Sequence, residues 1–161
     1  MLESKTKNNA TKLTKLSDRE VVLTRIFNAP RALVFKVYTD PKSIPFWWGP
    51  RKHITTVDKM DVKVGGLWRY VQNDRKGNEF AFNGEYREII PDKRLVYTFE
   101  FEAMPDHIIL ETIEFEDYKG KTKVTATALF QTTDDLNGML NSGMEEGASE
   151  SWDRLAELVE K

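Results

Sequence analysis

The stretch "SGMEEGASESWDRLAELVEK", residues 142–161, limits the folds that this chain can adopt. Apolar and small side chains recur in it at spacings of three and four residues, the period of one α-helical face. These positions are Met144, Ala148, Ser151, Trp152, Leu155, Leu158 and Val159. Acidic residues occupy the opposite face, at Glu145, Glu146, Glu150, Asp153 and Glu157. The pattern predicts a long amphipathic helix whose apolar face needs a partner surface.

Six segments that precede this helix predict the partner surface, a β-sheet. They are rich in β-branched and aromatic residues, and turn signals such as "DRKGN", "IPDK" and "YKGK" separate them. In chain order they read "HITTVDKMDV", "GLWRYVQN", "EFAFNGEYREII", "RLVYTFEFE", "HIILETIEFEDY" and "KTKVTATALFQT". Connections this short favour an antiparallel meander over parallel crossovers.

One more strand and two short helices are predicted nearer the N-terminus. "REVVLTRIF" reads as the strand. "APRALVFKVYTD" places Leu33, Val34, Val37 and Tyr38 on one helical face, and the prolines of "PKSIPFWWGP" leave room for a single helical turn. The predicted fold is therefore α+β, with a curled antiparallel sheet of about seven strands wrapped around the long helix.

Length and composition favour a single domain over residues 18–161 of the 161. Residues 1–17 are mainly Lys, Thr and Asn, and we expect them to form a flexible polar tail. No apolar run approaches the length of a membrane span or of a signal-peptide core, so we expect no membrane insertion and a cytoplasmic location.

Charge and residue content exclude several classes of function. With 24 Lys+Arg and 26 Asp+Glu, the net charge of −2 gives no overall field that would attract nucleic acid. The chain has no cysteine, which excludes disulfides, Cys-ligated zinc and thiol nucleophiles. The two histidines, His53 and His107, lie far apart in the sequence without a cluster of metal-ligating neighbours. Neither a metal site nor a cofactor is expected.

Alternation along the strands predicts an aromatic inner face of the sheet, because side chains two residues apart share a face. Aromatic residues with a polar tip can line an apolar pocket and still orient a ligand, although the same residues could fill a solid core. Small inward residues at Gly84, Ala126 and Ala128 favour a cavity. The predicted ligand-binding residues are Trp47, Trp48, Trp68, Tyr70, Phe82, Tyr86, Tyr97, Phe99, Glu111, Met144, Ala148 and Trp152.

"PFWWGP", residues 45–50, concentrates two of the four tryptophans in a turn. We interpret it as a wall of the cavity, with one of Trp47 and Trp48 packed inward and the other at the rim. The alternative is that both indoles are wedged beneath the first helices as ordinary core.

His107 and Glu111 form the most informative polar pair. In "HIILETIEF" they alternate in step with Ile109 and Ile113, so the strand could direct an imidazole and a carboxylate inward. A buried Glu111 would need a partner or a raised pKa. The opposite alternation would place Ile108 and Leu110 inside and leave Glu111 in water. No residue is assigned a catalytic role.

Four stretches together resemble the AHSA-like family, homologues of the activator of the heat-shock-protein-90 ATPase, within the SRPBCC or START-like helix-grip superfamily. They are "FNAPRALVFKVYTDPKSIPFWWGP", "DVKVGGLWRY", "FNGEYREIIPDKRLVYTFEFE" and "SGMEEGASESWDRLAELVEK". The resemblance implies a cavity between the sheet and the long helix that holds a small hydrophobic or aromatic molecule. It also implies an aromatic residue near Ala148, where this chain has Trp152 one turn later.

The resemblance leaves alternatives to simple ligand binding. One is a co-chaperone or protein-interaction module, although a chaperone partner is doubtful because the sequence lacks the separate N-terminal domain of the eukaryotic activators. Another is a cyclase-like or hydrolase-like enzyme, for which Glu111, His107 and the tyrosines are the candidate acids and bases. A homodimer that uses an exposed aromatic rim is a further alternative.

Overall fold

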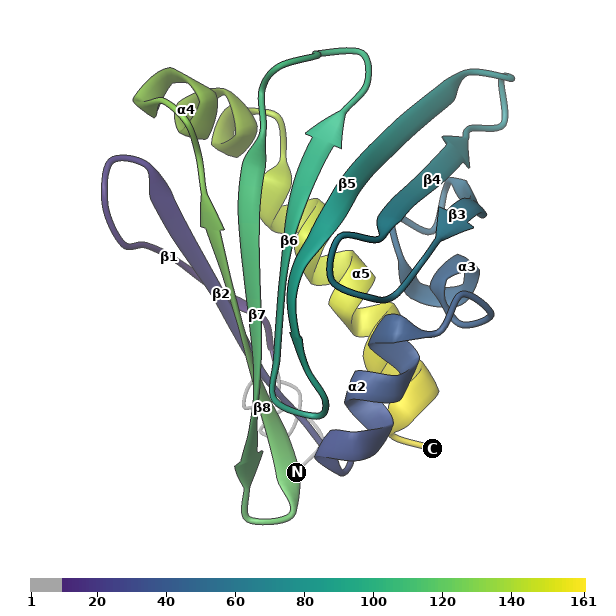
Figure 1. Ribbon diagram of the computed structural model, residues 1–161, viewed down its shortest axis with the longest axis vertical. Helices are drawn as coiled ribbons and strands as arrows, with labels where there is room; N and C mark the ends of the chain where they lie inside the picture. The colour runs from purple at the N-terminus through teal and green to yellow at the C-terminus, as the bar shows by residue number, and fades with distance from the viewer. Residues whose placement is uncertain (1–9) are drawn as a thin grey trace.

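The computed structural model describes residues 10–161 and has one antiparallel sheet that curls around a long helix (Figure 1). The strands are β1 (Lys12–Lys15), β2 (Glu20–Phe27), β3 (Ile54–Met60), β4 (Leu67–Asn73), β5 (Glu79–Ile90), β6 (Arg94–Phe101), β7 (Ile109–Tyr118) and β8 (Lys121–Leu129). The helices are α2 (Arg31–Thr39), α3 (Ile44–Trp47), α4 (Thr133–Asn141) and α5 (Met144–Val159). The predicted fold class, the helix-grip arrangement, is confirmed.

The sheet order is β1-β2-β8-β7-β6-β5-β4-β3, so β2 joins the meander of β3 to β8 beside β8. The long helix α5 crosses the inner face of this sheet, and α2 and α3 pack against α5 (Figure 1). Trp152, Leu155, Ala156 and Val159 form the buried stripe of α5, on the face that the sequence predicts. Apolar burial between helix and sheet is the main source of stability in such a two-layer fold.

The eighth strand, β1, corrects the prediction for the N-terminal segment. Residues 12–15, which the sequence assigns to a flexible tail, pair with β2 so that Leu13 lies opposite Leu23. Leu13 packs against the core, whereas Lys12 and Lys15 are exposed. A four-residue strand with one inward leucine has too little alternation to be recognised in a lysine-rich sequence. Residues 1–9 of the predicted tail lie outside the described residues.

A second difference is α4, which precedes α5 and which the sequence analysis did not predict. The Thr132 hydroxyl accepts a hydrogen bond from the Asp135 backbone N–H at 3.0 Å, and acidic residues fill the first turn, as expected at a helix start. Gly138 lies inside the helix, and a glycine there lowers helix propensity. The helix-start signal is therefore present in the sequence but is offset by the glycine.

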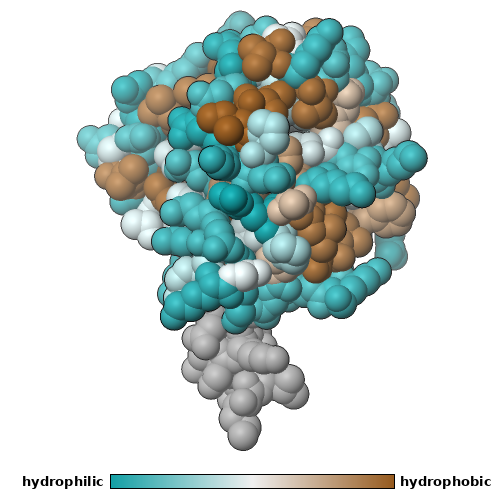
Figure 2. Space-filling view, turned by 60° about the horizontal axis from the view of Figure 1, so that its bottom comes forward, coloured by the Kyte–Doolittle hydropathy of each residue, from teal (hydrophilic) through white to brown (hydrophobic). Residues whose placement is uncertain are grey.

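Apolar side chains also reach the surface. Large exposed ones include Phe46, Ile54 and Val64. On the face drawn in Figure 2, hydrophobic surface lies in several separate areas between hydrophilic ones. Within residues 10–161, no helix has the length and apolar character that crossing a membrane requires.

Candidate functional site

The main cavity lies between α5 and the inner face of the sheet and has a volume of about 300 Å³. Its walls come from strand β2, strands β4 to β8, the α2 and α3 region, α4 and α5. Nine of the predicted ligand-binding residues line it: Trp47, Trp48, Phe82, Tyr97, Phe99, Glu111, Met144, Ala148 and Trp152. Because these residues come from five separate segments, the cavity is a product of the tertiary fold.

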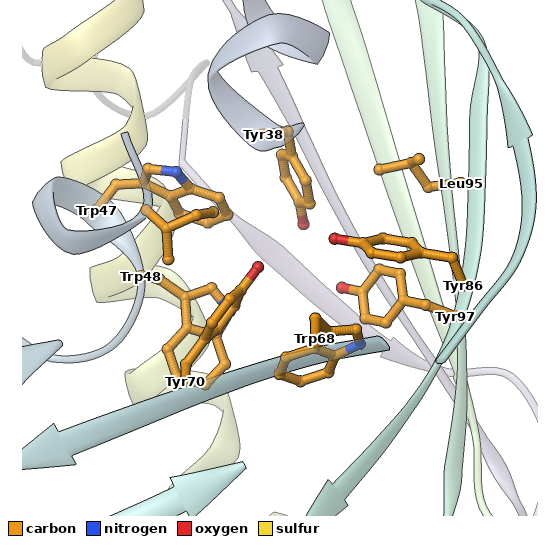
Figure 3. A pocket seen from close by; sticks show the side chains of 9 residues that line it. Tyr38, Trp47, Trp48, Trp68, Tyr70, Tyr86, Leu95 and Tyr97 are labelled. Carbon is orange, nitrogen blue, oxygen red and sulfur yellow. The ribbon is translucent and has the colours of Figure 1, made fainter. Parts of the chain in front are cut away.

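The other three predicted residues, Trp68, Tyr70 and Tyr86, border a separate internal space of about 20 Å³. Tyr38 and Tyr97 line both spaces. In Figure 3 the hydroxyl groups of the four tyrosines point toward the middle of this smaller space. Burial raises the pKa of Tyr86 to about 12 and the pKa values of Tyr70 and Tyr97 well above the ordinary value of 10.0. These hydroxyls therefore remain protonated, and able to donate, at neutral pH.

Trp68 explains why position 84 is glycine. Its buried indole Nε1 has no hydrogen-bond partner among residues 10–161. A Cβ on Gly84 would lie 2.5 Å from that nitrogen and 1.8 Å from the Thr98 carbonyl oxygen. Gly84 therefore makes room for the indole and the next strand, and not for the cavity as the sequence analysis supposes. Ala126 does line the main cavity.

Glu111 points into the main cavity from the centre of the sheet. On β7 it lies between Tyr97 of β6 and Ala128 of β8. Its carboxyl group makes no hydrogen bond or ion pair within residues 10–161. The side chain is half-buried because it borders the cavity, while protein atoms surround it on the other sides. The Glu111 side chain therefore faces inward, as one of the two interpretations of the strand alternation predicts.

Burial raises the pKa of Glu111 from its ordinary value of 4.5 to about 7, because the low-polarity surroundings disfavour the charged carboxylate. No basic side chain of the described residues lines the cavity to offset this cost, and the titratable groups beside Glu111 are the neutral tyrosines Tyr38 and Tyr97. Glu111 is thus a carboxyl group that changes its charge near neutral pH. Such a group in a cavity is a candidate for contact with a ligand.

His107 does not share this position. It precedes the first residue of β7, its side chain is 52% exposed, and its Nδ1 lies 2.9 Å from the Asp135 Oδ1. The period-two alternation that would direct it inward holds only within a strand, and the strand begins at Ile109. His107 therefore joins the turn before β7 to the first turn of α4. No group of three or more His, Asp or Glu side chains in the described part of the chain could hold a metal ion.

The "PFWWGP" segment forms one wall of the main cavity. Trp47 is buried and its indole N–H donates to the Val37 carbonyl at 3.3 Å, whereas Trp48 is half-buried. The Trp48 ring packs against Tyr70 and Phe82 at centroid distances of 5.0 and 5.2 Å. One indole is thus packed inward and the other is partly exposed, and both line the cavity.

Helix α5 fixes this segment through its polar side chains. The Gly49 N–H donates to the Ser151 hydroxyl at 3.0 Å, and the Arg154 guanidinium donates to the carbonyls of Gly49 and Pro45 at 2.8 and 3.3 Å. The sequence analysis assigns Ser151 to the apolar face of α5, although its hydroxyl is used for anchoring. The arginine therefore ties α5 to a carbonyl of α3 and to a carbonyl of the turn that follows it, through charge-assisted hydrogen bonds.

Strands β3 and β4 hold the same segment from the other side. The Thr55 hydroxyl donates to the Trp48 carbonyl at 2.7 Å and accepts from the buried Gln72 amide at 3.3 Å. The Gln72 Oε1 in turn lies 3.3 Å from the His53 Nδ1. The double tryptophan is therefore held by hydrogen bonds from two structural layers, which defines the shape of the cavity wall.

Gly49 provides a test of this anchoring. Its backbone has φ +91°, and a Cβ there would lie 1.6 Å from the Gln72 Nε2. We expect Gly49→Ala to lower the free energy of unfolding by about 1–2 kcal/mol more than Gly120→Ala does, measured by urea denaturation. Gly120 is the matched control, because its φ of +84° is similar and no atom lies within 4 Å of its added Cβ. Equal losses would show that Gln72 moves aside freely.

A second cavity of about 300 Å³ adjoins the first beneath α4. Phe99, Ile109 and Met139 line both cavities. The sequence analysis missed Met139 because it did not predict α4. It also missed Tyr38, Gln72 and Ser151. Tyr38 lies on the predicted apolar face of its helix, a signal that could have found it, whereas nothing in the local sequence marks Gln72.

Comparison with known proteins agrees with this architecture. A sequence model of the family described as "Activator of Hsp90 ATPase homolog 1-like protein" matches residues 28–160. This range contains every residue that lines the main cavity except Leu23. Among curated proteins, none matches the chain.

Several solved bacterial structures share the fold. Ms6760 from Mycobacterium smegmatis is 24% identical with a TM-score of 0.84, covering 93% of this chain and 96% of that chain. A protein from Rhodobacter sphaeroides is 19% identical with a TM-score of 0.88, covering 93% and 97%. A protein from Staphylococcus epidermidis is 25% identical with a TM-score of 0.79, covering 93% of each chain. The match extends over nearly the whole length of each protein.

Proposed function

Because the chain belongs to the family of Activator of Hsp90 ATPase homolog 1-like proteins, whose fold commonly binds hydrophobic ligands, we propose that its main cavity binds a small hydrophobic or aromatic molecule. The observation that carries the proposal is the cavity itself. It has about 300 Å³ of space between the sheet and α5, within the lower range of small-molecule sites. A solid core would leave no space of this size.

The lining supports binding of an apolar molecule. Aromatic side chains from α2, α3, β5, β6 and α5 face the space, and few polar groups interrupt them: mainly Gln72, Glu111 and Ser151. A pocket that is mostly apolar with a few fixed polar groups is typical of ligand sites. Met139 and Met144 add adaptable walls, because an unbranched thioether side chain fills irregular gaps.

The polar groups favour binding over catalysis as the proposal. Within the part of the chain that the structure describes, Glu111 is the one carboxyl group that lines the main cavity, and neither His53 nor His107 lines it. General acid–base chemistry usually uses a second positioned group that stabilises developing charge. Tyr38 and Tyr97 could donate hydrogen bonds, but the high pKa values that their burial causes make them poor acids.

Filling the cavity tests the proposal. We expect Ala148→Trp to weaken binding of the neutral probe 1-naphthylmethanol by about tenfold or more, because an indole at this position of α5 would occupy the ligand space. Isothermal titration calorimetry measures the affinity. Glu145→Trp is the matched control, because it adds the same side chain to an exposed position of the same helix.

The unmodified protein gives the complementary measurement. Native mass spectrometry of freshly purified protein should detect a co-purified small molecule, and Ala148→Trp should remove it. Absence of any bound species together with no heat of binding from the probe would contradict ligand binding and favour a protein-interaction role. Equal loss in Ala148→Trp and Glu145→Trp would show that the main cavity is not the binding site.

A further inference from the structure

We infer that the ligand of the main cavity is an organic cation, an apolar or aromatic molecule whose inner end carries a protonated amine that pairs with Glu111. This inference rests on the proposed function and narrows it to a chemical class. The fold by itself does not determine whether the ligand is charged. The side chains that surround the space give that information.

The sign of the charge in the cavity favours a cationic ligand. Among residues 10–161, Glu111 is the charged side chain of the lining, and no lysine, arginine or histidine of this part of the chain lines the space. Arg154, the basic residue of α5, does not line the space, and its guanidinium is directed at the carbonyls of Gly49 and Pro45. An anionic ligand would meet a carboxylate with no compensating cation. A cationic ligand would supply the partner that Glu111 lacks.

The aromatic wall around that carboxylate also favours a cationic ligand. Trp47, Trp48, Tyr97, Phe99 and Trp152 all border the same space as Glu111. The faces of aromatic rings attract cations, most strongly where water is excluded. One carboxylate inside a set of aromatic rings is therefore suited to an ammonium group, and the rest of the rings suit an apolar body.

The protein groups that face Glu111 provide no positive charge to pair with its carboxylate. Tyr38 of α2 and Tyr97 of β6 are neutral, Ala128 of β8 is apolar, and the α5 residues that line the cavity carry no titratable group. Burial without a cation raises the pKa of Glu111 to about 7. A bound ammonium would hold the carboxylate in its charged form. The affinity for an amine should therefore fall about tenfold per pH unit below pH 7.

Three probes of one shape test the inference: 1-naphthylmethylamine, 1-naphthylmethanol and 1-naphthoate, each titrated by calorimetry at pH 8. We expect the amine to bind about 10- to 100-fold more tightly than the alcohol, and the carboxylate to bind weakest. Glu111→Gln should remove the advantage of the amine and leave the affinity for the alcohol. Binding of the alcohol to this variant also shows that it is folded.

Glu116→Gln is the control variant, because this carboxylate is exposed on the same strand. Equal affinities of the three probes, or an amine preference that Glu111→Gln leaves intact, would overturn the inference while the proposed function stands. If Glu116→Gln lost the preference for the amine to the same extent, surface charge would be its cause, and the inference would be overturned as well. If none of the probes binds and nothing co-purifies, both the inference and the proposed function fail.

Discussion

Replacing Trp47 with Ala is expected to lower the free energy of unfolding by about 3–5 kcal/mol, the range for removal of a large aromatic side chain from a core. Trp47 is 2% exposed, its ring lies 4.7 Å from the ring of Tyr38, and its indole N–H is paired with the Val37 carbonyl. The loss combines buried area, a hydrogen bond and a new void beside two existing cavities. Urea denaturation followed by circular dichroism measures it.

The neighbouring Phe46 supplies the control within the same short helix. Its side chain is 64% exposed, so Phe46→Ala should change the stability by no more than about 0.5 kcal/mol. The contrast tests whether the segment packs as described, with Trp47 in the core and the adjacent Phe46 in water. Similar losses for the two substitutions would contradict this packing.

Replacing Glu111 with Gln is expected to stabilise the protein in a pH-dependent way. The folded protein holds the Glu111 proton up to a pKa of about 7, whereas the unfolded chain releases it at the ordinary value of 4.5. Between these values the folded state binds more protons, so stability falls as the pH rises from about 4.5 to about 7. Above pH 7 the full cost, up to about 3 kcal/mol, is present.

Glu111→Gln removes that cost, because a neutral amide replaces the carboxylate. The variant should therefore be more stable than the unmodified protein at pH 8, by up to about 3 kcal/mol, and nearly equal to it at pH 4.5. Urea denaturation across this range measures the difference. Glu116→Gln, on the outer face of the same strand, should show no such dependence on pH. A difference that grows toward low pH would have the wrong sign and would exclude an unpaired buried carboxyl.

The fold was largely predictable because its signals are local and periodic. The three- and four-residue spacing of Trp152 and Leu155 and the alternation of Tyr97 and Phe99 each depend on neighbouring residues alone. The family assignment is confirmed as well. The strand β1 and the helix α4 escaped prediction because one inward leucine and a helix interrupted by Gly138 give weak periodic signals.

The candidate site was predictable only in part. Alternation identified the aromatic wall and one of two orientations for Glu111, and the structure places that side chain in the cavity. Sequence could not separate the two spaces, so Trp68, Tyr70 and Tyr86 were grouped with the main cavity although they border the smaller one. The anchors of the double tryptophan were also hidden, because Gln72, Ser151 and Arg154 meet it only through long-range contacts. The ligand-binding role of the twelve residues named from the sequence stays a prediction.

The bonds from α5 to the double-tryptophan segment also determine when during synthesis the site can form. Gly49 and Ser151 are 102 positions apart in the chain. At translation rates of about 5–20 residues per second, the ribosome needs on the order of 5–20 s to pass from one to the other. During that interval Trp47, Trp48 and the aromatic face of the sheet have no helix to cover them. The nascent polypeptide is therefore most prone to aggregate just before α5 emerges.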